Sequence, residues 1–188
     1  MTVHITYFVH GTTTDNEQHI SSGWKDVELS ERGVQQSIEL REQTQNKTFD
    51  VVFTSDLQRA VNSAQLAWSD MYQIIQDARL RECNYGALNG GPSAIVEPMQ
   101  ESECIIKPFP EGESYEDVKA RVAGFLEFLK KNYDNKHVAV VGHKAPQLSL
   151  EVLLNGKTWK QALADDWRKT KSWQPGWDYT AITIEREA

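Results

Sequence analysis

The chain has 188 residues, of which 39% are hydrophobic and 25% charged, a composition typical of a soluble globular protein with one buried core. Its net charge of −7 argues against non-specific nucleic-acid binding and against anionic membrane surfaces, because both depend on clustered Lys and Arg. No apolar run approaches the roughly 20 residues of a transmembrane helix, and the first residues already resemble a strand, so neither a membrane span nor a signal peptide is expected. Cys83 and Cys104 fit neither a disulfide framework nor a zinc ribbon, which favours a cytoplasmic protein with free thiols.

The first predicted element is a strand over residues 5–9 that stops at His10. In α/β proteins, ligands bind beyond the carboxyl ends of the strands. Gly11 would let a ligand approach the backbone, and Thr13 and Asn16 supply polar groups, so the stretch suits an anionic substrate. The alternative is an ordinary strand exit with an exposed histidine.

The middle of the chain alternates between helical and strand patterns. The predicted elements are a polar loop over 12–28, a helix capped by Ser30 that fades near Asn46, a buried strand over 49–54, a helix over 55–68 and a strand over 72–76. Ser55 followed by Gln58 has the spacing of a capping box, which predicts where the second helix begins.

Residues 82–112 show no clear periodicity, and such long stretches are often lids or substrate loops. The predicted elements after them are a helix opened by Ser114, a strand over 137–141, a helix closed by Asn155-Gly156 and a last strand over 179–184. This order predicts an α/β fold, a three-layer α/β/α sandwich with a mostly parallel central sheet. We expect a single domain over 1–188, with 84–112 as a substrate or lid insertion.

Two strands far apart in the sequence end in similar residues, Val9-His10-Gly11 and Val141-Gly142-His143. If the strands are parallel in one sheet, both histidines lie at the same edge. A third strand ends at Ser55, and the helix after it carries Arg59. Two imidazoles and a guanidinium at one edge form a constellation that suits an anionic substrate.

These segments carry a resemblance to the histidine phosphatase superfamily, which includes cofactor-dependent phosphoglycerate mutases and fructose-2,6-bisphosphatase-like phosphatases. The matching segments are Val9–Asn16, Ser22–Ser30, Thr54–Ala60, Arg81–Gly90, Gly112–Ser114 and Val140–His143. Each motif is weak alone, but their order and spacing across nearly the whole chain are specific.

The resemblance implies a metal-independent reaction without a cofactor. His10 would attack phosphorus and form a phosphohistidine, and Glu82 would act as general acid and then as general base. His143 would be protonated with phosphate bound and would offset the charge on its oxygens, and Arg59 would bind phosphate through its planar guanidinium. The further substrate-binding residues that the resemblance implies are Gly11, Thr13, Asn16, Ser22 and Gly23.

One position departs from the family pattern. The family has an arginine before the nucleophilic histidine, and this chain has Val9. Loss of one well-placed donor typically costs about 2.7–4 kcal/mol of transition-state stabilisation. Lys144, where the family usually has a small residue, is a candidate for restoring part of this charge; the alternative is an ordinary surface lysine.

The predicted function is therefore a phosphatase that acts on a small phosphorylated metabolite. Because of Val9, a catalytically weak or inactive phosphate-binding relative is the main alternative. A phosphoglycerate mutase is a further alternative, but only about thirty residues separate Glu82 from Ser114 and they contain no Arg-Arg pair, whereas dedicated mutases carry a longer, more basic insertion there. The sequence leaves the substrate and the oligomeric state open.

Overall fold

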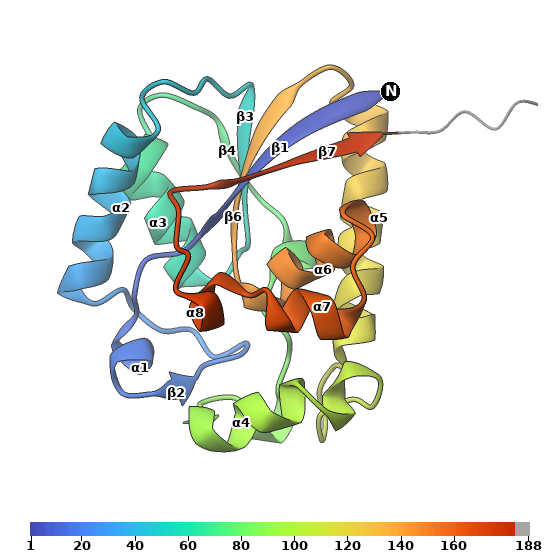
Figure 1. Cartoon of the computed structure of the whole chain (residues 1–188). Coiled ribbons are helices and arrows are strands. Elements are labelled where there is room, and N and C mark those ends of the chain that lie inside the picture. The colour runs from blue at the N-terminus through green and yellow to red at the C-terminus, as the bar shows by residue number, and fades with distance from the viewer. Residues whose placement is uncertain (183–188) are drawn as a thin grey trace, which may run out of the picture.

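A computed structural model of the protein describes residues 1–182. Its centre is a five-stranded sheet with the order β4-β3-β6-β1-β7, in which only β7 is antiparallel to its neighbour (Figure 1). The strands of this sheet are β1 (Thr2–Val9), β3 (Val51–Thr54), β4 (Ile74–Gln76), β6 (His137–Gly142) and β7 (Trp177–Ile182). The predicted mostly parallel α/β sandwich is thus confirmed.

Helices cover both faces of the sheet, α2 (Glu31–Gln43) and α3 (Gln58–Trp68) on one and α5 (Tyr115–Asn132) and α6 (Lys144–Leu154) on the other (Figure 1). Each face has its own apolar cluster, because successive side chains of a strand point to opposite faces. Phe8 packs with α2 and α3, whereas Tyr7 packs on the side of α5 and α6. The strands are therefore apolar on both faces, as expected for a parallel sheet between helices.

Several predicted boundaries were wrong for local reasons. Ser55 does not cap α3: the helix begins at Gln58, whose N–H donates to Asp26 at 2.9 Å, while Ser55 extends β3 by donating its backbone N–H to Val141. The predicted loop over 12–28 contains a one-turn helix, α1 (Thr14–Glu17), and a short strand, β2 (Ile20–Ser21). The start of α3 and the strand β2 depend on distant residues, Asp26 and β5 (Gly91–Pro92), whereas α1 begins at a local capping box of Thr13 and Asn16 that the prediction missed.

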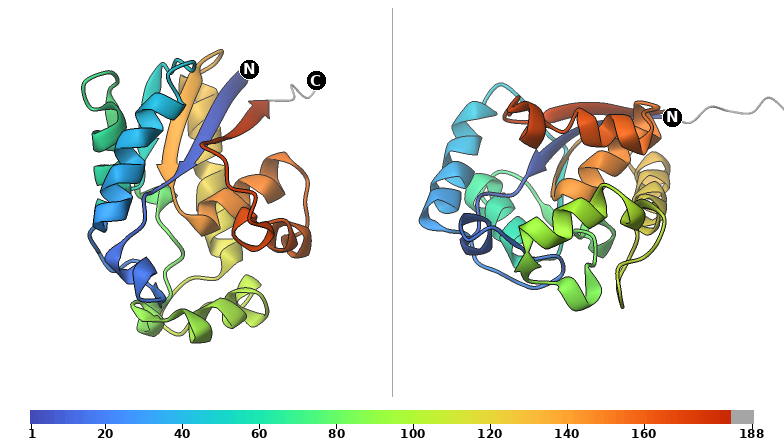
Figure 2. Two further views of the ribbon diagram at one scale, coloured as in Figure 1. Left: turned by 60° about the vertical axis from the view of Figure 1, so that its left-hand side comes forward. Right: turned by 60° about the horizontal axis from the view of Figure 1, so that its bottom comes forward.

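The segment predicted to be irregular contains a helix, α4 (Ser93–Gln100), preceded by β5 (Gly91–Pro92), which pairs with β2. Pro98 inside α4 hides the helical pattern, and only Val96 and Gln100 of the helix are buried. Both views in Figure 2 place α4 at the same end of the molecule as α1 and β2. At the other end of the chain, β7 begins at Trp177, and residues 183–184 of the predicted last strand lie outside the described residues.

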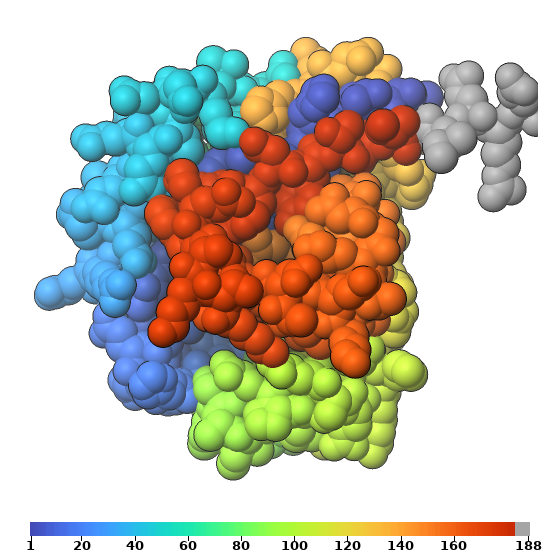
Figure 3. Space-filling model, viewed as in Figure 1, coloured from blue at the N-terminus to red at the C-terminus, as the bar shows by residue number. Residues whose placement is uncertain are grey.

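The C-terminal part of the chain crosses the front of the molecule through α7 (Trp159–Ala164) and α8 (Trp167–Thr170). In Figure 3 this red and orange segment borders the green segment that contains α4. Gly176 allows it to lie close to β1, since a Cβ there would be 2.8 Å from Phe8 Cε1. Within residues 1–182, none of the helices has the length and apolarity needed to cross a membrane.

The loop after β1 packs against α2 at two glycines. A Cβ on Gly11 would be 2.4 Å from the carbonyl oxygen of Gly33, and one on Gly33 would be 1.9 Å from that of Thr12. The close neighbour of Gly11 is therefore α2, and the role of this glycine in ligand approach stays a prediction. The contact fixes where His10 leaves the sheet.

Gly33→Ala is accordingly expected to destabilise the protein by about 1–3 kcal/mol, because backbone atoms on both sides must shift. Gly124→Ala is the matched control: a Cβ there has nothing within 4 Å, so the higher helix propensity of alanine is expected to add about 0.5–1 kcal/mol. Urea denaturation of both variants measures the two effects. Equal effects of the two substitutions would contradict the packing argument.

Candidate active site

The carboxyl ends of β1 and β6 bring two histidines together. Val9 pairs with Gly142 in parallel register, so His10 and His143 follow at the same edge of the sheet. Their ring centroids are 5.0 Å apart. The juxtaposition predicted from the two strand endings is present.

His10 lies beside a polar cavity of about 490 Å³. Of the residues singled out in the sequence, this cavity is lined by His10, Asn16, Ser22, Gly23, Arg59, Glu82 and Lys144. The C-terminal segment and α4 supply the remaining walls, so the cavity is assembled from distant parts of the chain.

Three of the predicted residues do not line this cavity. The Gly11 N–H donates to Ser63 at 3.0 Å. Thr13 is fully buried and caps α1: its hydroxyl accepts from the Asn16 N–H, and the Asn16 carboxamide oxygen accepts from the Thr13 N–H, both at 3.0 Å. His143 lies behind His10 and is 1% exposed. Gly11 and Thr13 therefore hold the loop in shape. Of the capping pair Thr13 and Asn16, only Asn16 faces the cavity.

The imidazole of His10 has one defined tautomer. Its Nδ1 lies 2.7 Å from the carbonyl oxygen of Gly11, which can only accept, so Nδ1 carries the hydrogen. Burial and the nearby positive charge of Arg59 lower the pKa of His10 to about 3. Nε2 is therefore unprotonated at neutral pH, and its lone pair is available as a nucleophile.

His143 is held through its backbone by Tyr7. The Tyr7 hydroxyl donates to the His143 carbonyl oxygen at 2.8 Å and accepts from the His143 N–H at 2.7 Å. A Cβ on Gly142 would lie 2.2 Å from that hydroxyl, so only glycine fits there. Burial, together with Arg59, holds the pKa of His143 well below its usual range.

Both ring nitrogens of His143 are buried and have no hydrogen-bond partner among the described residues. Unpaired buried polar atoms are uncommon and costly. A bound anion would reverse the effect of burial on this ring and favour its protonated form.

Glu82 is held at the other side of the cavity by the start of α6. Its carboxylate accepts the backbone N–H groups of Cys83, Lys144 and Ala145 at 2.8, 3.1 and 3.0 Å. Arg121 donates to the Glu82 carbonyl oxygen at 2.9 Å and pairs with Glu113. The carboxylate thus has a fixed position on the cavity wall.

Arg59 and Lys144 supply positive charge in different ways. Arg59 is 3% exposed and donates to the carbonyl oxygens of Gly23 and Lys25 at 2.7 and 3.0 Å. The Lys144 ammonium donates to Gln100 at 3.2 Å and lies 3.9 Å from Asp166. Lys144 therefore faces the cavity and not solvent, but part of its charge is neutralised by Asp166.

The sequence did not point to four residues that the structure adds to the site, namely Tyr7, Arg121, Asp166 and Arg168. Asp166 and Arg168 line the cavity from the C-terminal segment, and Tyr7 and Arg121 hold His143 and Glu82 in place. A strand tyrosine and helical or loop charges have no local signature, so only the fold reveals them.

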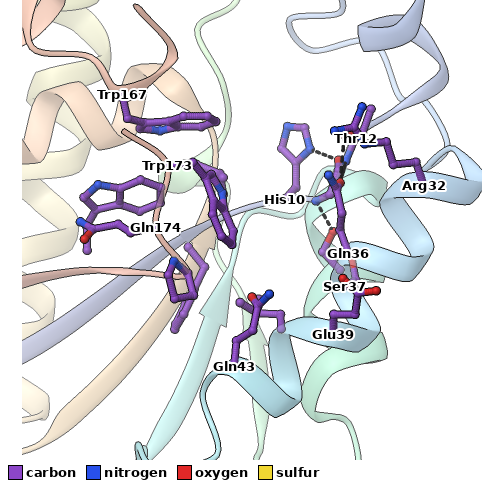
Figure 4. Close-up of a pocket in the computed structure, with 17 residues that line it drawn as sticks. His10, Thr12, Arg32, Gln36, Ser37, Glu39, Gln43, Trp167, Trp173 and Gln174 are labelled. Carbon is purple, nitrogen blue, oxygen red and sulfur yellow. Dashed lines mark hydrogen bonds between the residues drawn. The ribbon is translucent and has the colours of Figure 1, made fainter. Parts of the chain in front are cut away.

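A second cavity, of about 530 Å³, adjoins His10 on the side of α2 (Figure 4). Trp167 and Trp173 face Gln36 and Gln43 across it, and Trp173 is 51% exposed. Arg59 and Glu82 do not line this cavity, whereas both line the polar cavity together with His10.

The buried neutral histidines predict a pH dependence of stability. The folded protein holds His10 unprotonated down to about pH 3, whereas the unfolded chain protonates it near 6.5. Unfolding therefore takes up protons in this window, and the free energy of unfolding falls as pH is lowered, by up to about 1.4 kcal/mol per pH unit for each such histidine.

Chemical denaturation between pH 7 and 4.5 measures this slope. His10→Gln is expected to reduce it, whereas the same substitution at the exposed His19 is expected to leave it as it is. An equal slope in the unmodified protein and His10→Gln would mean that His10 is protonated in the folded state.

The fold is a mostly parallel α/β sandwich with two histidines at one edge of its sheet, and sequence comparison identifies the family. A model of the histidine phosphatase superfamily (branch 1) matches residues 7–182, and the chain belongs to this superfamily. It is 31% identical to a 2,3-bisphosphoglycerate-dependent phosphoglycerate mutase of Methylorubrum populi, over 80% of this chain and 78% of that protein. It is also 31% identical to phosphoserine phosphatase 1 of Hydrogenobacter thermophilus, over 71% of this chain and 67% of that protein.

Solved structures show the same fold. The structure of Bacillus stearothermophilus YhfR superimposes with a TM-score of 0.77 at 22% sequence identity, covering 85% of this chain and 83% of that one. Relatives in the superfamily thus include both phosphatases and mutases.

Proposed function

We propose that the protein is a metal-independent phosphatase that hydrolyses a small phosphorylated metabolite through a phosphohistidine on His10. The observation that carries this proposal is the tautomer of His10, whose Nδ1–H is bound to Gly11 and whose Nε2 is free beside Arg59 and Glu82. In the first step, Nε2 bonds to phosphorus, the bond from phosphorus to the ester oxygen breaks, and Glu82 protonates that oxygen. In the second step, Glu82 takes a proton from water, which attacks phosphorus and releases His10.

The geometry of in-line transfer assigns the two cavities different roles. The leaving oxygen lies on the far side of phosphorus from the attacking nitrogen. Because Glu82 must reach that oxygen, the organic part of the substrate occupies the polar cavity and not the aromatic one. The walls of the polar cavity there come from α4, through Ser93, Glu97 and Gln100. We infer that the 84–112 segment selects the substrate through these side chains.

The charge of the α4 wall favours a phosphatase over a mutase. Glu101 is paired with Lys169 at 2.6 Å, and Glu97 forms no ion pair with any of residues 1–182. A mutase that holds a bisphosphorylated intermediate needs cations for the second phosphate, whereas this wall is acidic. The favoured substrates are phosphate monoesters whose leaving group carries no further negative charge.

A panel of phosphorylated metabolites, assayed for release of inorganic phosphate with His10→Ala as control, tests the proposal. Esters with uncharged leaving groups are expected to exceed 3-phosphoglycerate and 2,3-bisphosphoglycerate in kcat/KM. Glu97→Gln should narrow the kcat/KM difference between these two groups of esters about fivefold, because it removes roughly 1 kcal/mol of repulsion between like charges about 4 Å apart in water. Transfer of phosphate between positions of phosphoglycerate would instead establish a mutase. Binding of phosphate without hydrolysis of any ester would establish the inactive alternative.

A further inference from the structure

The polar cavity lacks positive charge on the side of Val9. A phosphate monoester carries close to two negative charges at neutral pH. His10 and His143 are neutral in the ligand-free protein, because burial lowers the pKa of both. Arg59 approaches from the side of Gly23, and Val9, which also lines the cavity, contributes no charge.

Arg168 supplies a guanidinium to the same cavity from the C-terminal segment. It lines the cavity with His10 and Val9, and its guanidinium carbon lies 4.4 Å from the centre of the Trp167 ring. Its positive charge also lowers the pKa of both histidines, although burial lowers these pKa values most and Arg59 next.

Asp166 holds Arg168 in this position. It is 4% exposed, and its Oδ1 accepts the backbone N–H of Arg168 at 3.1 Å and the Nη1–H at 3.0 Å. Its Oδ2 is buried without a hydrogen-bond partner among the described residues and lies 3.9 Å from the Lys144 ammonium. One buried carboxylate thus gathers two cations, which leaves this corner of the cavity with a net positive charge.

Of these two cations, Arg168 is the better phosphate ligand. The Lys144 ammonium is shared between Gln100 and Asp166. The guanidinium of Arg168 has five N–H donors in a planar fork and uses only one nitrogen on Asp166, so further donors remain for a bidentate contact with phosphate.

We propose that Arg168 binds the phosphate group of the substrate and takes the place of an arginine at position 9, with Asp166 as the positioning residue that holds it. Val9 and Arg168 line the same cavity. The proposal assigns the missing charge to a residue of α8, 159 positions away in the sequence, and it rests on the proposed phosphatase function.

A double-mutant cycle tests whether positions 9 and 168 serve the same purpose. Binding of orthovanadate and of inorganic phosphate is measured by calorimetry, and kcat/KM is measured with p-nitrophenyl phosphate. Arg168→Ala is expected to weaken anion binding and kcat/KM by about 10²-fold or more, whereas Lys171→Ala, on the same segment and outside the cavity, should not. In the Arg168→Ala background, Val9→Arg should raise anion affinity and kcat/KM at least tenfold. In the unmodified protein, the gain from Val9→Arg should be at least tenfold smaller.

Two further variants distinguish a loss of phosphate binding from an effect on folding. Arg168→Lys keeps the charge beside Asp166 but loses the fork, and it should bind vanadate more weakly than the unmodified protein and more tightly than Arg168→Ala. Asp166→Asn should weaken binding in a way that Val9→Arg rescues, which a merely structural role would not produce.

Unaltered anion binding in Arg168→Ala would overturn the inference, and so would an equal effect of Val9→Arg in both backgrounds. Failure of the proposed function looks different. In that case anion binding would still depend on Arg168, but no ester would be hydrolysed.

Discussion

Replacement of His10 by alanine is expected to lower kcat/KM for p-nitrophenyl phosphate by at least about 10⁴-fold, because the nucleophile is lost while the fold is kept. No other described residue offers an unprotonated nitrogen at this point of the cavity: the ring of His143 is buried behind it, and Arg59 and Lys144 are cations. The matched control is His4→Ala, since His4 is exposed on β1 at the opposite end of the strand.

Chemical trapping of the phosphorylated protein tests the same role of His10 without relying on turnover. Brief reaction with a ³²P-labelled ester followed by alkaline quenching should leave an acid-labile label on the protein, and His10→Ala should carry none. A variant that keeps both its activity and its label would place the nucleophile elsewhere. Phosphate release without any label in the unmodified protein would favour direct attack by water.

Glu82→Gln is expected to lower kcat for an alkyl phosphate by about 10²–10⁴-fold, since the glutamine cannot protonate the leaving oxygen. The loss should be much smaller for p-nitrophenyl phosphate in the first step, because p-nitrophenolate leaves without a proton. Single-turnover kinetics with both esters measures that step. Glu17→Gln, on the exposed face of α1 and outside the cavity, is the control.

The comparison of the two esters distinguishes a loss of general acid catalysis from a disturbance of the structure. Glutamine keeps an acceptor for the N–H groups of Cys83 and Ala145 but turns an amide toward the N–H of Lys144, so some loss of stability is expected. A structural disturbance would slow both esters equally. Equal losses would therefore exclude Glu82 as the general acid.

The order of elements was readable from local pattern because strands and helices here are long or strongly apolar. The strand ending at His10, the strand ending at His143 and the helix opened by Ser114 were all predicted, and each is present. Errors fell where distant residues decide the outcome. Asp26 receives the first N–H of α3 in place of Ser55, and α4 forms around Val96 despite Pro98.

The candidate site divides in the same way. His10, Arg59 and Asn16 follow from motifs at the end of a strand or the start of a helix, and Glu82 follows from a motif in an irregular segment. All four residues line one cavity. Thr13 was expected to bind substrate, but it is buried, does not line the cavity, and accepts the Asn16 N–H as a helix cap. A hydroxyl three residues after a motif histidine has several possible hydrogen-bond partners, and the sequence alone does not show which of them it uses.

The sequence by itself therefore determined the α/β class and the pairing of two histidines at one sheet edge, and it led to the prediction that a charge is missing at Val9. Only the tertiary structure decided the tautomer of His10, the burial of His143 behind it and the arrival of Arg168 and Asp166 in the cavity. The physical reason is how far apart in the sequence the interacting residues lie. Apolar periodicity and strand endings are local, whereas burial, charge compensation and hydrogen-bond choice depend on which distant segments the fold places together.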